Sequence, residues 1–404
     1  MKKIQGGVCA PLGFKASGVH CGIRKNKTKE DLALIVSDVT CSAAAVYTTN
    51  KVKGAPIAVT KKNLENGRAR AVICNSGNAN TCNADGVEKA ERMCALTSEY
   101  TGIPASDVIV ASTGVIGQIL PIEPIEGGMQ ALADGLSVEG AGKAARAIMT
   151  TDTVAKEFAA EDVIGGKVVR VGAMAKGSGM IHPNMATLLC FVTTDAAVSP
   201  EMLDKALHAA VADTLNMVSI DGDTSTNDML TVMASGLSGM KEIVGEGKDY
   251  EKFLALLTAV LTDVSRAIAK DGEGATRLLE CKVTGAPDVA TAKKIAKSVV
   301  CSSLLKAAIS AADANWGRVL CAIGYTDAQF DIDKIDVDLS SEEGSIAVCR
   351  NGSGVEFDED KAKKILTPDE VTVKVNCNIG SAAATAWGCD LTCDYVKINA
   401  DYRT

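Results

Sequence analysis

Short runs of β-branched and other apolar residues alternate along the chain with polar, glycine-containing stretches. Runs of four to eight such residues, bounded by turn-forming residues, are typical of buried β-strands. Six runs are therefore predicted to be strands. They cover residues 32–39, 71–74, 108–110, 168–171, 188–192 and 230–233.

In two later stretches, apolar residues recur every three to four positions, which is the period of an amphipathic helix. In the first, Ser199 is predicted to be the N-cap and Pro200 the first helical residue, and Leu203 and Leu207 lie on one face. The second stretch covers residues 251–270. Strands and helices thus occur in clusters, which favours a layered α+β core.

The last third of the chain changes character, because charged and apolar residues alternate there in short runs between residues 332 and 380. The sequence NGSG at 351–354 lies between two of these runs and is typical of a hairpin turn. We therefore predict a smaller α/β unit at about 285–385, followed by a final strand and a tail within 386–404.

The composition limits the classes of function that need to be considered. The chain has 404 residues, of which 47% are hydrophobic, enough for a sizeable core and for two or three structural units. Aromatic residues make up only 3%, and the formal net charge is −8. Nucleic-acid surfaces are rich in stacking aromatics and basic patches, so nucleic acid is not an expected partner.

Targeting and metal-binding signals are absent from the sequence. No apolar run follows the lysines at the N-terminus, and no stretch reaches the ~18 apolar residues of a membrane-spanning helix. The fourteen cysteines include no C-x-x-C pair, and the three histidines form no ligand-like cluster. We expect a cytoplasmic protein with free thiols, no membrane segment and no metal.

Common catalytic and nucleotide-binding signatures are also missing. The chain contains no G-x-x-x-x-G-K-[ST] loop, no G-x-G-x-x-G after a strand and no G-x-S-x-G elbow. Residues 221–228 (DGDTSTND) superficially resemble a calcium loop, but the glycine and the glutamate that such a loop requires are not in place. The segment is predicted to be a polar turn that leads into a strand.

One stretch carries more specific chemistry. A glycine-rich turn leads into His182 and Pro183, where proline restricts the backbone, and Thr187 then opens an almost wholly apolar strand. A threonine in this position suits attack of its hydroxyl on the preceding carbonyl. The resulting ester would hydrolyse and leave Thr187 with a free α-amine. On these residues alone, a purely structural threonine is the more common alternative.

Residues 176–187 (KGSGMIHPNMAT) closely resemble the cleavage-site motif of the ornithine acetyltransferase (glutamate N-acetyltransferase) family. Further blocks resemble the family in the family's order and span essentially the whole chain, which makes the resemblance specific. They are 74–80 (CNSGNAN), 111–117 (ASTGVIG), 148–153 (IMTTDT), 219–228 (SIDGDTSTND), 271–276 (DGEGAT), 313–318 (DANWGR) and 390–404 (DLTCDYVKINADYRT).

The resemblance implies self-cleavage between Ala186 and Thr187, which would give an alpha chain of residues 1–186 and a beta chain of residues 187–404. Thr187 would be the catalytic nucleophile, and Thr113 and Gly114 would form the oxyanion hole. The implied substrate-binding residues are Thr150, Lys176, Thr187, Glu273, Asn399 and Thr404. The last two imply that the tail returns to the active site.

The implied reaction moves an acetyl group from N-acetylornithine to glutamate through an acetyl-threonine ester. An α-amine has a pKa of about 7.7–8.0, against ~10.4 for lysine, so roughly 10–15% of it is free base at pH 7. It is also tethered to the hydroxyl that it must deprotonate, which removes the need for a histidine base.

The family fold is a stack of β-sheets between helices, similar to that of N-terminal-nucleophile hydrolases but differently connected. The resemblance further implies a heterotetramer of two alpha and two beta chains and no cofactor, with acetyl-CoA left open as a second acetyl donor. Two alternatives remain. One is a self-cleaving amidohydrolase or aminopeptidase of related fold, which delivers the acyl group to water. The other is a non-catalytic protein in which Thr187 is only a strand residue.

Overall fold

The computed structural model describes residues 1–182 and 188–400. These residues form two compact units. The first spans Met1–Gly177, Asn184–Leu215 and Thr224–Val264, and the second spans Ser178–Pro183, Asn216–Asp223 and Ser265–Thr404. Both units are therefore discontinuous in sequence.

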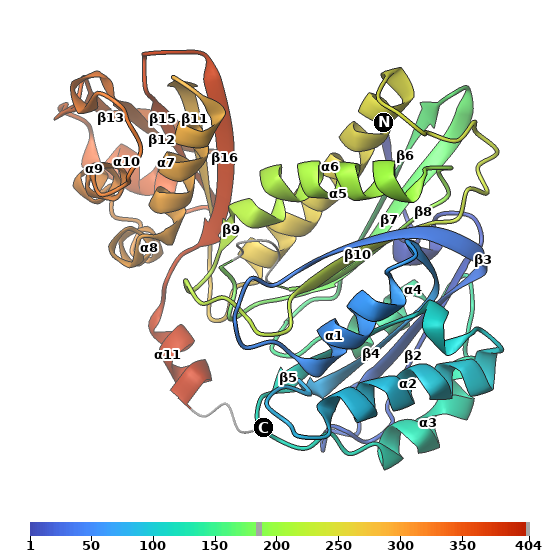
Figure 1. Cartoon of the computed structure of the whole chain (residues 1–404). Coiled ribbons are helices and arrows are strands. Elements are labelled where there is room, and N and C mark those ends of the chain that lie inside the picture. Colours follow the sequence, from blue (N-terminus) through green and yellow to red (C-terminus); the bar gives the residue numbers. More distant parts are fainter. Residues whose placement is uncertain (183–187, 401–404) are drawn as a thin grey trace. The chain divides into compact units, whose positions relative to one another are not determined.

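Nine strands among the described residues of the first unit form one mixed sheet (Figure 1). Its order is β1-β6-β7-β8-β10-β3-β4-β5, and β2 pairs with β3. All six predicted strands lie within or overlap strands of this sheet, which confirms those predictions. The strands are β1 (Lys2–Ile4), β2 (Phe14–Val19), β3 (Leu32–Tyr47), β4 (Arg68–Asn78), β5 (Val108–Val115), β6 (Lys156–Ile164), β7 (Lys167–Lys176), β8 (Leu189–Thr194) and β10 (Met229–Ala234).

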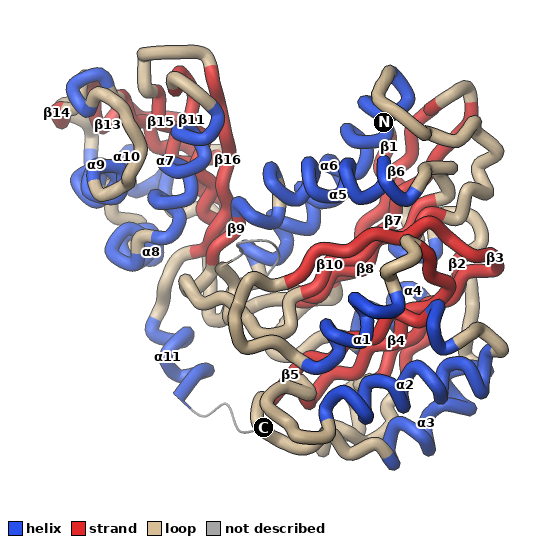
Figure 2. Tube along the Cα trace, viewed as in Figure 1, coloured by secondary structure: helices blue, strands red, loops and turns tan. Residues whose placement is uncertain are grey.

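Helices cover this sheet because both faces of its strands are apolar. In β3, Leu32 and Leu34 pack in a buried cluster with residues of α2 and α3, whereas Ala33 and Ile35 pack in another with α4. Figure 2 shows the helices and the strands of this sheet in two colours. Full burial of one such leucine or isoleucine contributes about 1.5–3 kcal/mol. The helices are α1 (Ala55–Asn63), α2 (Gly86–Thr101), α3 (Glu123–Asp134), α4 (Ala141–Ala147), α5 (Pro200–Asp213) and α6 (Lys248–Lys270), the last of which continues into the second unit.

Both helix predictions are confirmed. The hydroxyl oxygen of Ser199 accepts a hydrogen bond from the backbone N–H of Met202 at 3.3 Å, and Pro200 is the first residue of α5. The stretch predicted from 251 to 270 lies within α6. The layered α+β fold class is therefore confirmed in outline.

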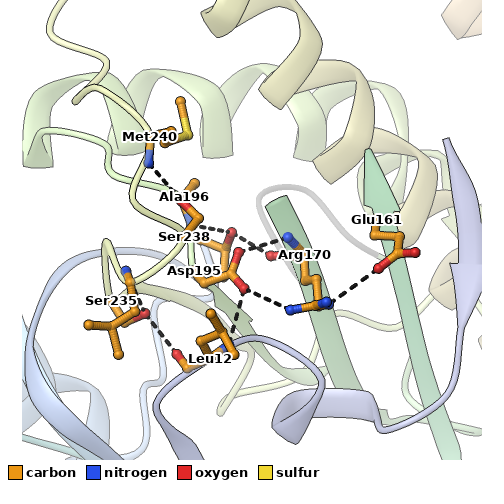
Figure 3. A network of polar contacts seen from close by, with 10 residues as sticks. Leu12, Glu161, Arg170, Asp195, Ala196, Ser235, Ser238 and Met240 are labelled. Atoms are coloured by element: carbon orange, nitrogen blue, oxygen red, sulfur yellow. Dashed lines mark hydrogen bonds and ion pairs between the residues drawn. The ribbon is translucent and has the colours of Figure 1, made fainter. Parts of the chain in front are cut away.

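Strand β8 lies inside the sheet, antiparallel to β7 and parallel to β10, and each of its residues is buried. Its far end is fixed by Asp195, the residue that follows it (Figure 3). The Asp195 carboxylate accepts the N–H groups of Leu12 at 3.1 Å and Arg170 at 2.8 Å. The chain thus enters a firmly held inner strand two residues after Thr187.

The second unit contains a separate sheet of seven described strands, in the order β14-β13-β12-β15-β11-β16-β9. Helix α7 packs on β11 and β16, and α10 packs on β12 and β13. The strands are β9 (Val218–Ser219), β11 (Leu278–Ala286), β12 (Asp336–Ser341), β13 (Gly344–Arg350), β14 (Ser353–Gly354), β15 (Glu370–Asn376) and β16 (Ala382–Cys389). The helices are α7 (Val289–Cys301), α8 (Ser303–Ser310), α9 (Trp316–Gly324), α10 (Glu359–Leu366) and α11 (Cys393–Ala400).

The predicted hairpin turn joins β13 to β14. Asn351 and Gly352 have φ angles of 49° and 71°, the left-handed pair that a two-residue hairpin turn requires. No helix in the described part of the chain is both long and apolar enough to cross a membrane.

Candidate functional site

The predicted site residues are divided between the two units. Those in the first unit are Thr113, Gly114, Thr150 and Lys176, and those in the second are Glu273 and Asn399. Ala186, Thr187 and Thr404 lie outside the described residues.

Two neighbouring strands hold the start of β8. Leu189, its first residue, pairs with Lys176 at the end of β7 and with Met229 at the start of β10. The backbone N–H of Met229 also donates to the carbonyl oxygen of Leu188 at 2.9 Å. The residue directly after Thr187 is therefore fixed by the sheet, with Lys176 on a bordering strand.

Thr113 and Gly114 lie at the end of β5, which continues past the predicted end at residue 110. Gly114 pairs with Gly77 of β4 at a point where the register shifts beside Asn78. Its φ is +132°, and a Cβ there would lie 2.3 Å from the carbonyl carbon of Gly77. Only glycine fits this close approach, and irregularities of register are over-represented next to active sites.

Asp152 organises the surroundings of Thr150 and Lys176. Its carboxylate accepts the N–H of Thr150 at 3.0 Å, the N–H of Gly177 at 2.7 Å and the ammonium of Lys156 at 2.7 Å. Burial by itself would raise the pKa of Asp152, but the charges of Lys156 and Lys176 and the Thr150 N–H hold it well below its usual range. A charged Asp152 therefore links two predicted substrate residues, and the sequence reasoning missed it.

Asp228, directly before β10, is a second buried carboxyl group that the sequence reasoning missed. Its side chain is only 2% exposed, and its Oδ2 atom has no hydrogen-bond partner among the described residues. Burial raises the pKa of Asp228 well above its usual range, although the Lys176 charge opposes the shift. The structure therefore favours a proton on this carboxyl group.

The Asp228→Asn variant should make thermal stability less dependent on pH. A carboxyl group whose pKa is raised in the folded state binds its proton more tightly there, so stability falls as pH rises from about 3.9, the unfolded value, through the folded value. Asparagine cannot titrate. The melting temperature of the variant relative to wild type should rise with pH across this window, as thermal unfolding at a series of pH values would measure. The exposed residue Asp223, changed to asparagine, is the control, and parallel curves for wild type and Asp228→Asn would contradict the expectation.

In the second unit, the structure brings Glu273 and Asn399 together. The Asn399 Nδ2 donates to Glu273 Oε2 at 2.7 Å, and the Glu273 N–H donates to the carbonyl of Ser178 at 2.8 Å. A Cβ on Gly179 would lie 2.4 Å from the Glu273 carboxyl carbon, so glycine makes room for this group. The next regular element after Glu273 is the strand β11.

The segment upstream of the predicted cleavage point is also anchored. The Asp221 carboxylate accepts the N–H of Met180 at 2.5 Å and that of Ile181 at 2.8 Å. The carbonyl of Ile181 accepts the N–H of Ile220 at 2.7 Å. Residues 221–228 do form the predicted turn into a strand, and in addition the start of this turn binds the chain before residue 183.

His182 is held as a neutral imidazole. Its Nδ1 lies 3.0 Å from the hydroxyl oxygen of Ser219. Burial, together with the nearby Lys297 charge, lowers the pKa of His182 to about 4. A histidine with this pKa carries almost no charge at neutral pH. Within the described residues, no group of three or more His, Cys, Asp or Glu side chains could hold a metal ion.

Comparison with known proteins relates the chain to one family. The model of the ArgJ family matches residues 15–404. The chain is 50% identical over 406 residues to the arginine biosynthesis bifunctional protein ArgJ of Symbiobacterium thermophilum, covering 100% of both chains. It is 50% identical over 392 residues to ArgJ 1 of Clostridium acetobutylicum, covering 97% of this chain and 96% of the relative. The crystal structure of ArgJ from Bacillus halodurans is 44% identical with a TM-score of 0.50, and covers 52% of this chain and 97% of that one.

Proposed function

The chain belongs to the ArgJ family, and from this premise we propose that it is a self-cleaving acetyltransferase that moves the acetyl group of N-acetylornithine to glutamate. The observation that carries the proposal is the KGSGMIHPNMAT motif, because it leads toward the inner strand β8. Hydrogen bonds hold Ile181, inside the motif, within the second unit and Leu188, directly after the motif, within the first.

Self-cleavage would begin with attack of the Thr187 hydroxyl on the carbonyl carbon of Ala186. The peptide C–N bond breaks, an ester forms, and the α-nitrogen takes up the proton. Water then hydrolyses the ester to give a carboxylate on Ala186 and a free amine on Thr187. Two hydrogen-bonded residues near the bond support this step: Ile181 is held within the second unit, and Leu188 is held within the first. The solved ArgJ chain of Bacillus halodurans corresponds to 52% of this chain, about the share of one fragment.

Acetyl transfer would use the amine that cleavage releases. The amine accepts the proton of the Thr187 hydroxyl as its oxygen attacks the acetyl carbonyl of N-acetylornithine, and it returns a proton to the leaving ornithine amine. The amine of glutamate then attacks the acetyl-threonine ester and regenerates the hydroxyl. Both steps pass through an oxyanion, for which Thr113 and Gly114 are the proposed donors.

The proposed substrate contacts are those that the family resemblance implies, and the charges of Lys176 and Glu273 indicate which substrate group each would bind. Lys176 and Thr150 in the first unit are proposed to bind a substrate carboxylate, beside the fixed charge of Asp152. In the second unit, Glu273 and Asn399 form a hydrogen-bonded pair suited to a substrate ammonium group. The proposal includes the tail residue Thr404 as a further contact.

The remaining parts of the proposal concern the assembly and the donor. The two fragments are proposed to remain together as a heterotetramer of two alpha and two beta chains in the cytoplasm. No resident cofactor is needed. If acetyl-CoA also serves as a donor, it would enter as a co-substrate that forms the same acetyl-threonine ester.

The test uses N-acetylornithine labelled in its acetyl group, supplied with and without glutamate. The proposal predicts labelled acetylglutamate when glutamate is present and little release of acetate. A self-cleaving amidohydrolase would instead release labelled acetate at the same rate with or without glutamate. Labelled acetate without acetylglutamate would therefore overturn the transferase assignment in favour of hydrolysis.

A further inference from the structure

The side chain of Asn227 forms four hydrogen bonds inside the first unit, where it is only 7% exposed. Its Nδ2 donates to the carbonyl oxygens of Ala79 at 2.5 Å and Ser112 at 2.9 Å. Its Oδ1 accepts the hydroxyls of Thr81 at 2.5 Å and Thr226 at 2.6 Å. A carbonyl oxygen can only accept, so the nitrogen must face the two carbonyls, and both ends of the carboxamide are occupied.

These bonds leave the carboxamide little freedom. Gly54 packs against it so closely that a Cβ there would lie 2.5 Å from Nδ2. The two carbonyls belong to different chain segments, because Ala79 follows β4 and Ser112 lies in β5. Asn227 therefore ties together the ends of two adjacent strands, one of which carries Thr113 and Gly114.

The bond to Ser112 acts on the proposed oxyanion hole through peptide geometry. The carbonyl of Ser112 and the N–H of Thr113 belong to one planar peptide unit. Fixing that carbonyl sets the plane from which the Cα and the hydroxyl of Thr113 project, and the peptide to Gly114 continues from the same Cα. Asn227 does not itself need to touch the substrate.

The chain around Asn227 also borders β8, the strand that begins two residues after Thr187. Two residues after Asn227, the N–H of Met229 binds the carbonyl of Leu188, which directly follows Thr187 in the chain. The segment from Asn227 to Met229 thus contacts two strands. Its Asn227 side chain holds β5, which carries Thr113 and Gly114, and its Met229 N–H holds the residue before β8. Small errors in such an arrangement have large effects, since a displacement of about 1 Å can lower a rate ~100-fold.

We infer that Asn227 is a positioning residue that orients the Thr113 and Gly114 donors toward the oxyanion of acetyl transfer. This inference rests on the proposed function. Oxyanion donors act in the transition state and contribute little to binding of the ground state. Loss of the orientation should therefore lower kcat and leave the KM for N-acetylornithine nearly unchanged.

The test replaces Asn227 with aspartate in the full-length protein, with kcat expressed per cleaved chain. Aspartate keeps acceptors for the two threonine hydroxyls but cannot donate to the two carbonyls. We expect kcat to fall about 10- to 100-fold with KM within about twofold of wild type. An unchanged kcat would overturn the inference. So would a folded variant that fails to cleave, because the side chain would then be required one step earlier.

Asn63 provides a matched control at the other end of the same strand. Its Nδ2 donates two hydrogen bonds to backbone carbonyls, as the Nδ2 of Asn227 does. The acceptors are the carbonyl oxygens of Ala105 at 3.2 Å and Val108 at 2.8 Å. Asn63→Asp should lower the melting temperature by an amount comparable to Asn227→Asp but leave kcat as in wild type. A fall in kcat in this control as large as that in Asn227→Asp would mean that loosening of the strand explains both, and would overturn the inference.

A second variant applies if Asn227→Asp does not fold. Thr81→Val removes one hydroxyl that holds Oδ1 and lets the carboxamide turn while keeping its donors. It should lower kcat by a smaller factor, again at constant KM, and an unchanged kcat would overturn the inference. Failure of the proposed function is distinguishable, because wild type itself would then make no acetylglutamate.

Discussion

The Thr187→Ala variant is expected to remain a single uncut chain and to lose acetyl transfer entirely. The substitution removes the oxygen that attacks the Ala186 carbonyl, so neither the ester nor the free amine can form. Denaturing electrophoresis should show two fragments for wild type, residues 1–186 and 187–404, and one full-length band for the variant.

Serine at position 187 is the matched control for this variant. It retains the hydroxyl and should cleave, although more slowly, because it lacks the methyl group that restricts the threonine rotamer. If wild type itself runs as one intact chain, the non-catalytic alternative is favoured. If Thr187→Ala is still cut at this bond, the hydroxyl is not the attacking group.

The Gly114→Ala variant is expected to lower kcat by about 10²–10³-fold, the usual effect of losing one oxyanion donor, or about 2.7–4 kcal/mol. The added Cβ would lie 2.3 Å from the carbonyl carbon of Gly77, and the φ of +132° is strained for alanine. The end of β5 must therefore shift, and its N–H groups shift with it. Steady-state kinetics on the cleaved enzyme would measure the effect, with KM expected to change little.

Gly117→Ala is the control that distinguishes the effect of the close contact at residue 114 from the effect of a strained backbone angle. Gly117 also has a positive φ, +78°, but a Cβ there would have no neighbour within 4 Å. This variant should lose some stability and keep its kcat. Equal values of kcat for Gly114→Ala and wild type would show that the end of β5 does not stabilise the oxyanion.

Local signals in the sequence account for the elements that could be predicted. The apolar runs mark the strands of the first sheet, Ser199 and Pro200 mark the start of α5, and Asn351 with Gly352 marks a hairpin turn. Each signal depends on neighbours within a few residues, whose preferences act before any tertiary contact is made. These elements can therefore be predicted from a single sequence.

Strand order and the composition of the two units could not be predicted in this way, because both depend on contacts between distant parts of the chain. Nothing in residues 189–194 indicates that β8 lies between β7 and β10, or that residues 178–183 and 216–223 belong with the C-terminal unit. The predicted alpha chain (1–186) and beta chain (187–404) would arise from cleavage of a peptide bond, which is a different matter from the two compact units. This cleavage stays a prediction.

In the candidate site, too, the features that depend on contacts between distant residues could not be predicted from the sequence. The nucleophile came from a motif that resembles a family, because chemistry alone does not distinguish Thr187 from other threonines that open strands. Asp152, Asn227 and Asp228 were missed although they lie within motifs that were recognised. Their importance comes from burial and from bonds between distant positions, such as that between Asn227 and Ser112, which are 115 residues apart. In sequence, Asn227 and Asp228 look like members of a polar turn.

The most direct test of a threonine that supplies both the nucleophilic oxygen and the base is the mass of the fragment beginning at residue 187 during turnover. Cleaved enzyme would be mixed with N-acetylornithine without glutamate and quenched in acid, and the fragments would be weighed and sequenced by mass spectrometry. The prediction is a fragment heavier by one acetyl group, carried as an ester on Thr187, which disappears when glutamate is added. Active enzyme whose bond between residues 186 and 187 is intact, or an acetyl group on any other residue, would contradict it.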